Sequence, residues 1–238
     1  MGAAGWNFYL SPAALGLIRP VNHNESVQVI PAINAPDFER ARQLVSVAKS
    51  FLPREAWLHF DLGDGIFSSI RNWGDPAEFQ SLRLGFFKTE VHLMAENPEE
   101  LAEAWLKAGV KRLIVHLETL VDSALVMALC QKYQAELMLA IVPETIVENL
   151  IPYFSNVHSF QILGVRPGKA GQVFQPEVLG KVEFLRRRLP TAKIEVDGGI
   201  NLTIAKLIKE AGADMVASAS YIFNSSDPGK AYQELVGL

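Results

Sequence analysis

The sequence contains very little cysteine. Its single cysteine, Cys130, excludes an intramolecular disulfide framework and a metal site built from clustered thiolates. Cys130 shares a helical pattern with Leu125 and Leu129, a setting typical of a buried structural thiol rather than a nucleophile. This cysteine usage fits a cytoplasmic protein.

Long apolar runs are also missing. No stretch approaches the roughly 18 to 20 apolar residues that a transmembrane helix needs, so we expect no membrane partner. Residues 1–26 are apolar in places, but their first charge is Arg19, which follows the apolar stretch, and the basic start of a secretory signal is absent. We therefore expect residues 1–26 to form an N-terminal extension.

No strong excess of positive charge is present. The chain has 22 basic and 26 acidic residues, for a net charge of −4, and it shows no basic block or RNA-binding signature. We therefore expect no nucleic-acid partner, although a phosphate ligand needs only a local positive pocket. The hydrophobic fraction of 49% is enough to fill a sizeable core.

From Val27 onward, short β-rich runs alternate with longer helical patterns. Strands alternating with helices favour a parallel sheet, and eight such units favour a closed (β/α)8 barrel (TIM barrel), here a single domain over residues 27–238. A doubly wound open sheet is the competing fold, but it rarely needs eight complete repeats. The expected strands are Val27–Asn34, Trp57–Asp61, Lys88–His92, Arg112–His116, Glu136–Ile141, Ser159–Leu163, Lys193–Val196 and Met215–Ser218. The expected helices are Asp37–Ser50, Pro76–Leu84, Pro98–Ala108, Val121–Tyr133, Glu144–Tyr153, Pro176–Leu189, Thr203–Glu210 and Pro228–Val236.

Four ionisable side chains come from the ends of three of these strands. Catalytic groups of such barrels come from the C-terminal ends of strands, and here those ends carry His59, Asp61, His92 and Asp197. Residues two apart share one face of a strand, so His59 and Asp61 point the same way. The intervening and flanking residues should face the helical layer: Leu58, Phe60 and Leu62.

Any one of these four side chains alone is more often a hydrogen-bonded structural group. Together, two imidazoles and two carboxylates form a ligand set suited to one divalent transition metal, Zn²⁺, Fe²⁺, Mn²⁺ or Co²⁺. Burying several ionisable groups at one barrel mouth is costly unless they pair or bind a metal.

Two of the four, Asp61 and Asp197, also suit a particular reaction. Inversion of a carbon next to a carbonyl requires a base on one face and an acid on the other. A metal on the carbonyl and enolate oxygens stabilises the charge that develops. Asp61 and Asp197 come from strands across the barrel and are therefore candidates for the catalytic pair.

Three late loops are rich in small residues. Gly164–Gln172 follows the sixth strand, Gly198-Gly199 the seventh, and Ala219-Ser220 the eighth. Late barrel loops often bind phosphate through backbone N–H groups, and glycine allows a close approach to the anion. The alternative is that they are only tight turns. The candidate phosphate-binding residues are Gly168, Lys169, Ala170, Gly171, Gly198, Gly199, Ala219 and Ser220.

These residues lie in segments through which the chain resembles ribulose-phosphate 3-epimerase, over about residues 29–223. The segments are His59–Gly65, Glu90–Pro98, Val115–Glu118, Pro167–Phe174 and Ile194–Ile200.

The resemblance implies a divalent metal held by His59, Asp61, His92 and Asp197, with Asp61 and Asp197 as the acid–base pair. It implies conversion of D-ribulose 5-phosphate to D-xylulose 5-phosphate through a metal-stabilised enediolate, as part of the pentose phosphate pathway. It also implies Met94 in the substrate site, phosphate bound by the late loops, a sugar phosphate as the partner molecule, and a homo-oligomer.

The chain departs from the family pattern around the expected substrate. A serine of the first strand is replaced by Ala32, and a methionine and a histidine after the second strand are replaced by Gly63 and Ile66. A methionine of the sixth strand is Leu163. The usual Gly-Phe-Gly-Gly reads Gly-Lys-Ala-Gly at positions 168–171, and the late Gly-Ser pair is Ala219-Ser220. The identity of the sugar therefore stays open.

Three alternatives follow from these departures. The first is an epimerase of another ketose phosphate. The second is a decarboxylase or aldolase on the same barrel, disfavoured because the stretch Asp61–Asp64 lacks the lysine of the Asp-x-Lys-x-x-Asp pattern. The third is a non-catalytic phosphosugar-binding barrel, disfavoured because all four metal-ligand types are retained. We expect His116 to be a buried, hydrogen-bonded residue.

Overall fold

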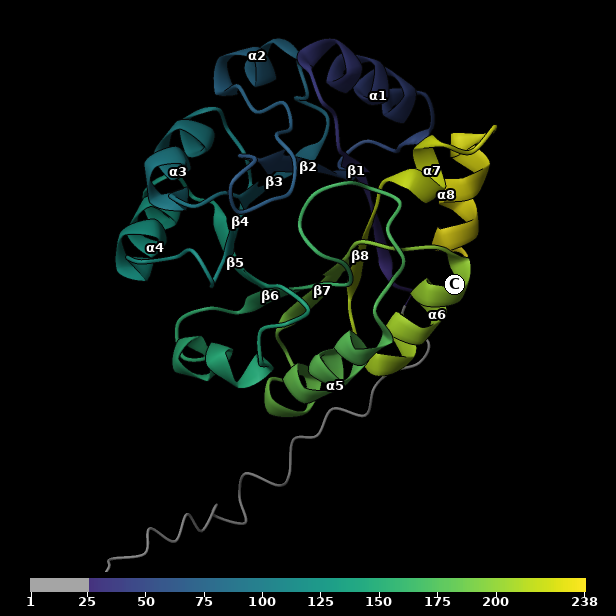
Figure 1. Cartoon of the computed structure of the whole chain (residues 1–238). Coiled ribbons are helices and arrows are strands. Elements are labelled where there is room, and N and C mark those ends of the chain that lie inside the picture. Colours follow the sequence, from purple (N-terminus) through teal and green to yellow (C-terminus); the bar gives the residue numbers. More distant parts are fainter. Residues whose placement is uncertain (1–25) are drawn as a thin grey trace, which may run out of the picture.

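A computed structural model describes residues 26–238 and shows a closed barrel of eight parallel strands (Figure 1). Each strand pairs with the next in sequence, and β8 pairs with β1 to close the barrel. The predicted fold class is confirmed. The strands are β1 Gln28–Ile33, β2 Trp57–Gly63, β3 Lys88–Met94, β4 Arg112–His116, β5 Glu136–Ile141, β6 Ser159–Leu163, β7 Lys193–Asp197 and β8 Met215–Ser218.

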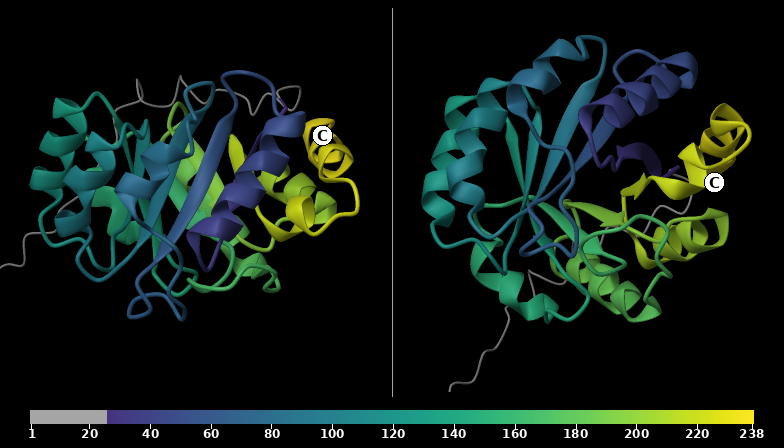
Figure 2. Two further views of the ribbon diagram at one scale, coloured as in Figure 1. Left: turned by 90° about the horizontal axis from the view of Figure 1, so that it is seen from above. Right: turned by 45° about the horizontal axis from the view of Figure 1, so that its top comes forward.

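Helices follow the strands and surround the barrel on the outside (Figure 2). Their bounds are α1 Phe38–Phe51, α2 Pro76–Ser81, α3 Pro98–Lys107, α4 Ser123–Lys132, α5 Leu179–Arg188, α6 Leu202–Ala211, α7 Ser220–Phe223 and α8 Pro228–Val236, with 3₁₀ segments η2 Val147–Tyr153 and η3 Pro176–Val178. Apart from Ser26, the predicted N-terminal extension lies outside the described residues. Within residues 26–238, no helix has both the length and the apolarity needed to span a membrane.

Local sequence explains where the helices begin. The side chain of Asp37 accepts a hydrogen bond from the backbone N–H of Arg40 and caps α1, and Asn201 caps α6 in the same way. Pro98 and Pro228 occupy first-turn positions, where a missing N–H costs nothing.

The fifth strand–helix unit differs from the expectation. The pattern at 144–153 predicts an ordinary helix, but the structure has the 3₁₀ segment η2, with Pro152 inside it. Proline cannot donate the main-chain hydrogen bond of an α-helix, and its ring clashes with the preceding turn. The sequence also gave no expectation of α7, a single turn directly after β8.

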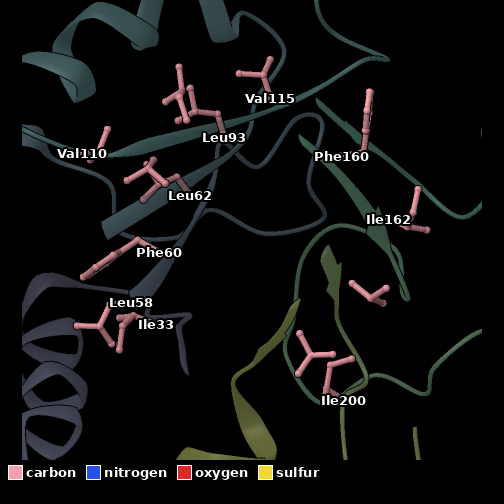
Figure 3. Packing of buried hydrophobic residues seen from close by; sticks show 14 of the residues in the cluster. Ile33, Leu58, Phe60, Leu62, Leu93, Val110, Val115, Phe160, Ile162 and Ile200 are labelled. Atoms are coloured by element: carbon pink, nitrogen blue, oxygen red, sulfur yellow. The ribbon is translucent and has the colours of Figure 1, made fainter. Parts of the chain in front are cut away.

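The hydrophobic core lies mainly between the strands and the helices. Leu58, Phe60 and Leu62 of β2 are buried in it, as the alternation of side chains predicts. Figure 3 shows these three residues with Leu93 of β3, Ile162 of β6 and others in this layer.

The interior of the barrel is smaller and partly polar. It contains an apolar cluster that includes Ile30, Ile114, Met138 and Met215. Beside this cluster lie buried charged residues, among them Glu90, Arg112 and Glu195. The inward faces of β2, β3 and β7 therefore carry ionisable groups toward the C-terminal mouth.

Candidate metal and substrate site

Two imidazoles and two carboxylates converge at the C-terminal mouth of the barrel. One ligand atom from each of His59, Asp61, His92 and Asp197 lies within 4.8 Å of the other three. Asp61 Oδ1 is 3.1 Å from His59 Nε2 and 3.2 Å from His92 Nδ1. Asp197 Oδ2 is 3.4 Å from His92 Nδ1 and 4.0 Å from His59 Nε2. The structure thus brings together all four residues that the sequence singles out.

Strand register explains this convergence. Asp61 of β2 is paired with His92 of β3, so both side chains project at one level of the barrel. His59 lies two residues earlier on the same face of β2. Asp197 is the last residue of β7, a strand that is not adjacent to β2 or β3, and it reaches the cluster across the interior.

The Nδ1 atom of His59, which does not face Asp61, is hydrogen-bonded to a buried carboxylate. It lies 2.8 Å from Glu90 Oε1, and both side chains are fully buried. Because the Glu90 carboxylate accepts the Nδ1–H, Nε2 is the nitrogen of His59 that faces Asp61 and Asp197.

The outer nitrogen of His92 has a second imidazole as its partner. His92 Nε2 is 2.8 Å from His116 Nε2, and His116 Nδ1 is 3.1 Å from Glu118 Oε2. If His116 donates its Nδ1–H to Glu118, its Nε2 must accept the N–H of His92. Nδ1 is then the nitrogen of His92 that faces Asp61 and Asp197. His116 is fully buried and hydrogen-bonded, as expected.

The electrostatics of the four residues suit a cation. Burial opposes protonation of His59 and His92, but hydrogen bonds and charge from Asp61 and Asp197, with Glu90 added at His59, raise the pKa of both imidazoles. Burial opposes ionisation of Asp61, but hydrogen bonds from the two histidines hold its pKa below the usual range. Protons on the imidazoles thus balance the carboxylates. A divalent cation at the centre would replace them, which fits this donor set.

A second cluster of buried charged residues contacts the four-residue site through Glu90. The guanidinium of Arg112 contacts Glu90 and lies 2.9 Å from Glu136 Oε2 and 3.6 Å from Glu195 Oε2. Burial and the nearby charge of Glu90 raise the pKa of Glu195 to about 8. One negative charge, on Glu90, therefore links Arg112 to His59.

A cavity of about 40 Å³ opens beside the four residues. Asp61, Asp197, Leu163 and Asn34 line it, together with every residue predicted to contact substrate or phosphate: Met94, Gly168, Lys169, Ala170, Gly171, Gly198, Gly199, Ala219 and Ser220. The late loops and the two carboxylates therefore share one space.

Three of the departures from the family pattern lie outside the lining of this cavity. Ile66 is 69% exposed, and Ala32 is buried on β1 beside His59. Gly63 packs under its own loop, where an added Cβ would overlap Ser68 Oγ and lie 2.5 Å from Ile70 O. Among the described residues, these three do not line the cavity, whereas Leu163 does.

The comparisons with known proteins identify one family. The model of the ribulose-phosphate 3 epimerase family matches residues 28–223, most of the chain. The chain belongs to this family. The family is one of epimerases, and the chain is accordingly an isomerase.

Curated relatives show the same similarity over most of their length. Ribulose-phosphate 3-epimerase of Chlamydia pneumoniae is 32% identical over 84% of this chain and 90% of the relative. The cytoplasmic isoform of ribulose-phosphate 3-epimerase from Oryza sativa subsp. japonica is 34% identical over 75% of this chain and 80% of the relative.

Solved structures share the fold at low identity. The 3-hexulose-6-phosphate synthase of Salmonella typhimurium superposes with a TM-score of 0.68 at 12% identity, covering 89% of this chain and 97% of the other. This likeness shows the barrel fold and does not extend to the chemistry of the site.

Sequence reasoning missed three residues around the site and one contact between histidines. Glu90 and Glu195 share strand faces with His92 and Asp197, so alternation would have placed them inside the barrel. Asn34 was missed because only ionisable groups were sought at strand ends. The contact of His116 with His92 depends on the packing of β3 beside β4 and has no signal in either segment alone.

Proposed function

We propose that this chain is a metal-dependent 3-epimerase that interconverts D-ribulose 5-phosphate and D-xylulose 5-phosphate. The observation that carries the proposal is the position of Asp61 and Asp197. Each presents a carboxylate oxygen to the cluster of His59 and His92, and each also lines the cavity formed by the late loops. Family membership supports the same reaction.

The two aspartates supply the proton transfers in this proposal. One carboxylate takes the C3 proton from one face of the sugar, and the other returns a proton to the opposite face. The low pKa of Asp61 keeps it ionised and ready to accept a proton. Their origin in β2 and β7, two strands that are not adjacent in the barrel, supports this arrangement.

His59, Asp61, His92 and Asp197 are the residues that would hold the cation. When bound, a divalent cation supplies positive charge against the oxygens on which negative charge develops. Glu90 and His116 orient the two imidazoles for this role. The ligand set admits Zn²⁺, Fe²⁺, Mn²⁺ or Co²⁺.

The phosphate group is assigned to the late loops. Gly198 and Gly199 adopt positive φ values of 96° and 71°, which expose backbone to the cavity at the end of β7. Ser220 lines the same cavity, and Lys169 adds a cationic side chain. The predicted homo-oligomer and cytoplasmic setting belong to this proposal, and the similarity to a cytoplasmic isoform from rice supports the cytoplasmic setting.

The test is incubation of metal-loaded protein with D-ribulose 5-phosphate in deuterated water. We expect D-xylulose 5-phosphate with deuterium at C3, measured by NMR. An absence of both epimer and label would refute the pentose assignment, and six-carbon ketose phosphates would then be assayed in the same way.

The variants Asp61→Asn and Asp197→Asn test the two-base assignment. Each should lose epimerisation by about 10²-fold or more. Each should still exchange the C3 hydrogen of only one epimer, because one base remains, and the two variants should differ in which epimer they label. Equal labelling of both epimers by either variant would contradict the assignment.

A second candidate is a phosphosugar-binding barrel without catalysis, motivated by Leu163 and the altered loop at 168–171 in the cavity wall. Metal analysis of protein purified under metal-replete conditions separates the two. A stoichiometric transition metal favours the epimerase, and a metal-free protein favours the binding barrel.

A further inference from the structure

Asn34 follows β1 and lies at the centre of two contacts that join different parts of the site. Its Nδ2 is 2.9 Å from Asp61 Oδ2 and 3.2 Å from the backbone oxygen of Gly168. Both partners are acceptors, so the orientation of the amide is fixed: the NH₂ group must face them. The two N–H bonds of one amide therefore link a carboxylate of the site to a loop.

The two oxygens of the Asp61 carboxylate have different partners. Its Oδ1 faces His59 Nε2 and His92 Nδ1, where the cation is expected, and its Oδ2 accepts from Asn34. A donor on Oδ2 fixes the rotation of the carboxylate plane. It thereby determines which oxygen faces the cation and which faces the cavity.

The loop bound by Asn34 covers the site. Residues 164–175 run from β6 across the opening of the barrel toward β1 and β2 (Figure 1). The tip is held at two adjacent residues, because the N–H of Ser69 donates to the oxygen of Pro167 at 3.3 Å and Asn34 donates to Gly168. Gly168 has a φ of 140°, a conformation that favours glycine, which allows this close approach.

The space under the loop is small. The centres of water-sized spheres can occupy only about 40 Å³ of it, so the cavity is narrow. If the loop opens to admit a substrate, movement of Gly168 breaks its hydrogen bond to Asn34.

We propose that Asn34 is a positioning residue that makes the orientation of the Asp61 carboxylate depend on closure of the 164–175 loop. With the loop closed, Gly168 and Asp61 hold the amide between them. With the loop open, the amide loses one of its two acceptors and holds Asp61 less firmly. Asp61 therefore reaches its reactive orientation only when the loop covers the substrate. This inference rests on the proposed role of Asp61 in epimerisation.

The position of Asn34 on its strand supports this role. Ile30 faces the barrel interior, so alternation places Ala32 and Asn34 on the same inner face. The pairing of Ala32 with His59 brings Asn34 to the level of Asp61. Ala32 has no hydrogen-bonding side chain, so Asn34 is the polar group that this face of the strand offers to Asp61.

The test compares Asn34→Leu, which keeps the branched shape and removes the donors, with Gln172→Met as the matched control. Gln172 donates to the backbone oxygens of Arg166 and Lys169 and braces the same loop without touching Asp61. Hydrogen–deuterium exchange of residues 164–175 reports the loop. The visible spectrum and affinity of bound Co²⁺ report Asp61.

We expect faster loop exchange in both variants, a large change of the Co²⁺ spectrum in Asn34→Leu, and a smaller change in Gln172→Met, where Asn34 still donates to Asp61. Its kcat should fall by roughly 10- to 100-fold, the loss expected for a hydrogen bond to a charged group. Gln172→Met should change mainly KM. Wild-type loop exchange in Asn34→Leu, or a Co²⁺ spectrum unchanged from wild type, would overturn the proposal.

Neither the exchange measurement nor the Co²⁺ spectrum needs a substrate. A wild-type protein that binds Co²⁺ but does not turn over D-ribulose 5-phosphate would therefore contradict the proposed substrate, while the spectra of the two variants would still decide the role of Asn34.

Discussion

The Nε2 atoms of His92 and His116 lie 2.8 Å apart in the fully buried interior of the barrel. Two imidazole nitrogens at this distance share one proton, so one ring donates and the other accepts. Burial lowers the pKa of His116 to about 4, so His116 is neutral at physiological pH and its single N–H is available to Glu118. His116 is therefore the acceptor, and it sets the tautomer of His92.

Replacement of His116 by phenylalanine tests this chain of contacts. The phenyl ring fills the space but offers no acceptor to His92, so the imidazole should lose its fixed tautomer. Loss of such a supporting partner typically costs 10- to 100-fold in metal affinity. Competition with a chromophoric chelator measures it. Phe67→Leu is the control, since the Phe67 ring packs 4.7 Å from that of His116 without a hydrogen bond. Wild-type affinity in His116→Phe would exclude the role.

Metal binding should release protons. The pKa values of His59 and His92 are raised in the metal-free protein, so both bind protons near neutral pH that a cation must displace. The affinity for Zn²⁺ should therefore rise with pH, with up to about two protons released per ion. Calorimetry in buffers of different ionisation enthalpy counts them. Binding without proton release would show that the imidazoles are already neutral.

The same pKa shifts determine how the stability of the metal-free protein depends on pH. A histidine whose folded pKa is raised contributes stability that is fully present below its unfolded pKa of 6.5 and lost as pH rises through the folded pKa. His116 acts in the opposite sense, because its contribution is present above 6.5 and lost as pH falls toward 4. Added metal should remove the first dependence and leave the second.

Glu90 and Glu195 both contact Arg112, yet their replacement by glutamine should have different effects. At pH 7 the pKa of about 8 keeps most of Glu195 protonated, so Glu195→Gln replaces one neutral group by another. Because the unfolded wild-type chain has released this proton at pH 7, we expect Glu195→Gln to have a higher free energy of unfolding than the wild type. Glu90→Gln removes the charge that Arg112 and His59 share, and should cost about 3 to 5 kcal/mol. Urea unfolding at pH 7 measures both.

The pH dependence of the two glutamate variants provides a check. Glu195 has a folded pKa above its unfolded value of 4.5, so its contribution is full below pH 4.5 and is lost as pH rises through about 8. Glu195→Gln should therefore become more stable relative to wild type between pH 6 and pH 8.5. A constant difference across this range would mean that Glu195 is ionised throughout.

The sequence was most informative where chemistry and periodicity coincide. Alternation on β2 placed His59 and Asp61 inward and Phe60 outward, and the order of eight units implied the closed barrel that the structure shows. The strand ends were less certain. β2 and β3 extend to Gly63 and Met94 because they pair with each other over their full length, and this pairing has no signal in either strand alone.

The surroundings of the four residues were less predictable. The role of Asn34 depends on a loop 134 residues later in the chain, and no local pattern indicates that contact. Pairs such as His92 with His116 arise because neighbouring strands bring their inner faces together. Gly63 and Ile66 are departures from the family pattern after the second strand, and the path of the 64–72 loop keeps both out of the cavity lining.

Gly63 offers a last test, because its lack of a side chain has a packing reason. An added Cβ would overlap Ser68 Oγ and lie 2.5 Å from Ile70 O, and the backbone oxygen cannot move without shifting the loop. Gly63→Ala should therefore destabilise the protein by about 1 to 3 kcal/mol. Gly180→Ala in α5 is the matched control, since a Cβ there meets nothing within 4 Å and alanine favours the helix by about 0.5 to 1 kcal/mol. Thermal unfolding should move the two variants in opposite directions. Equal stability of Gly63→Ala and wild type would show that the loop adjusts freely and that glycine at this position is not required by packing.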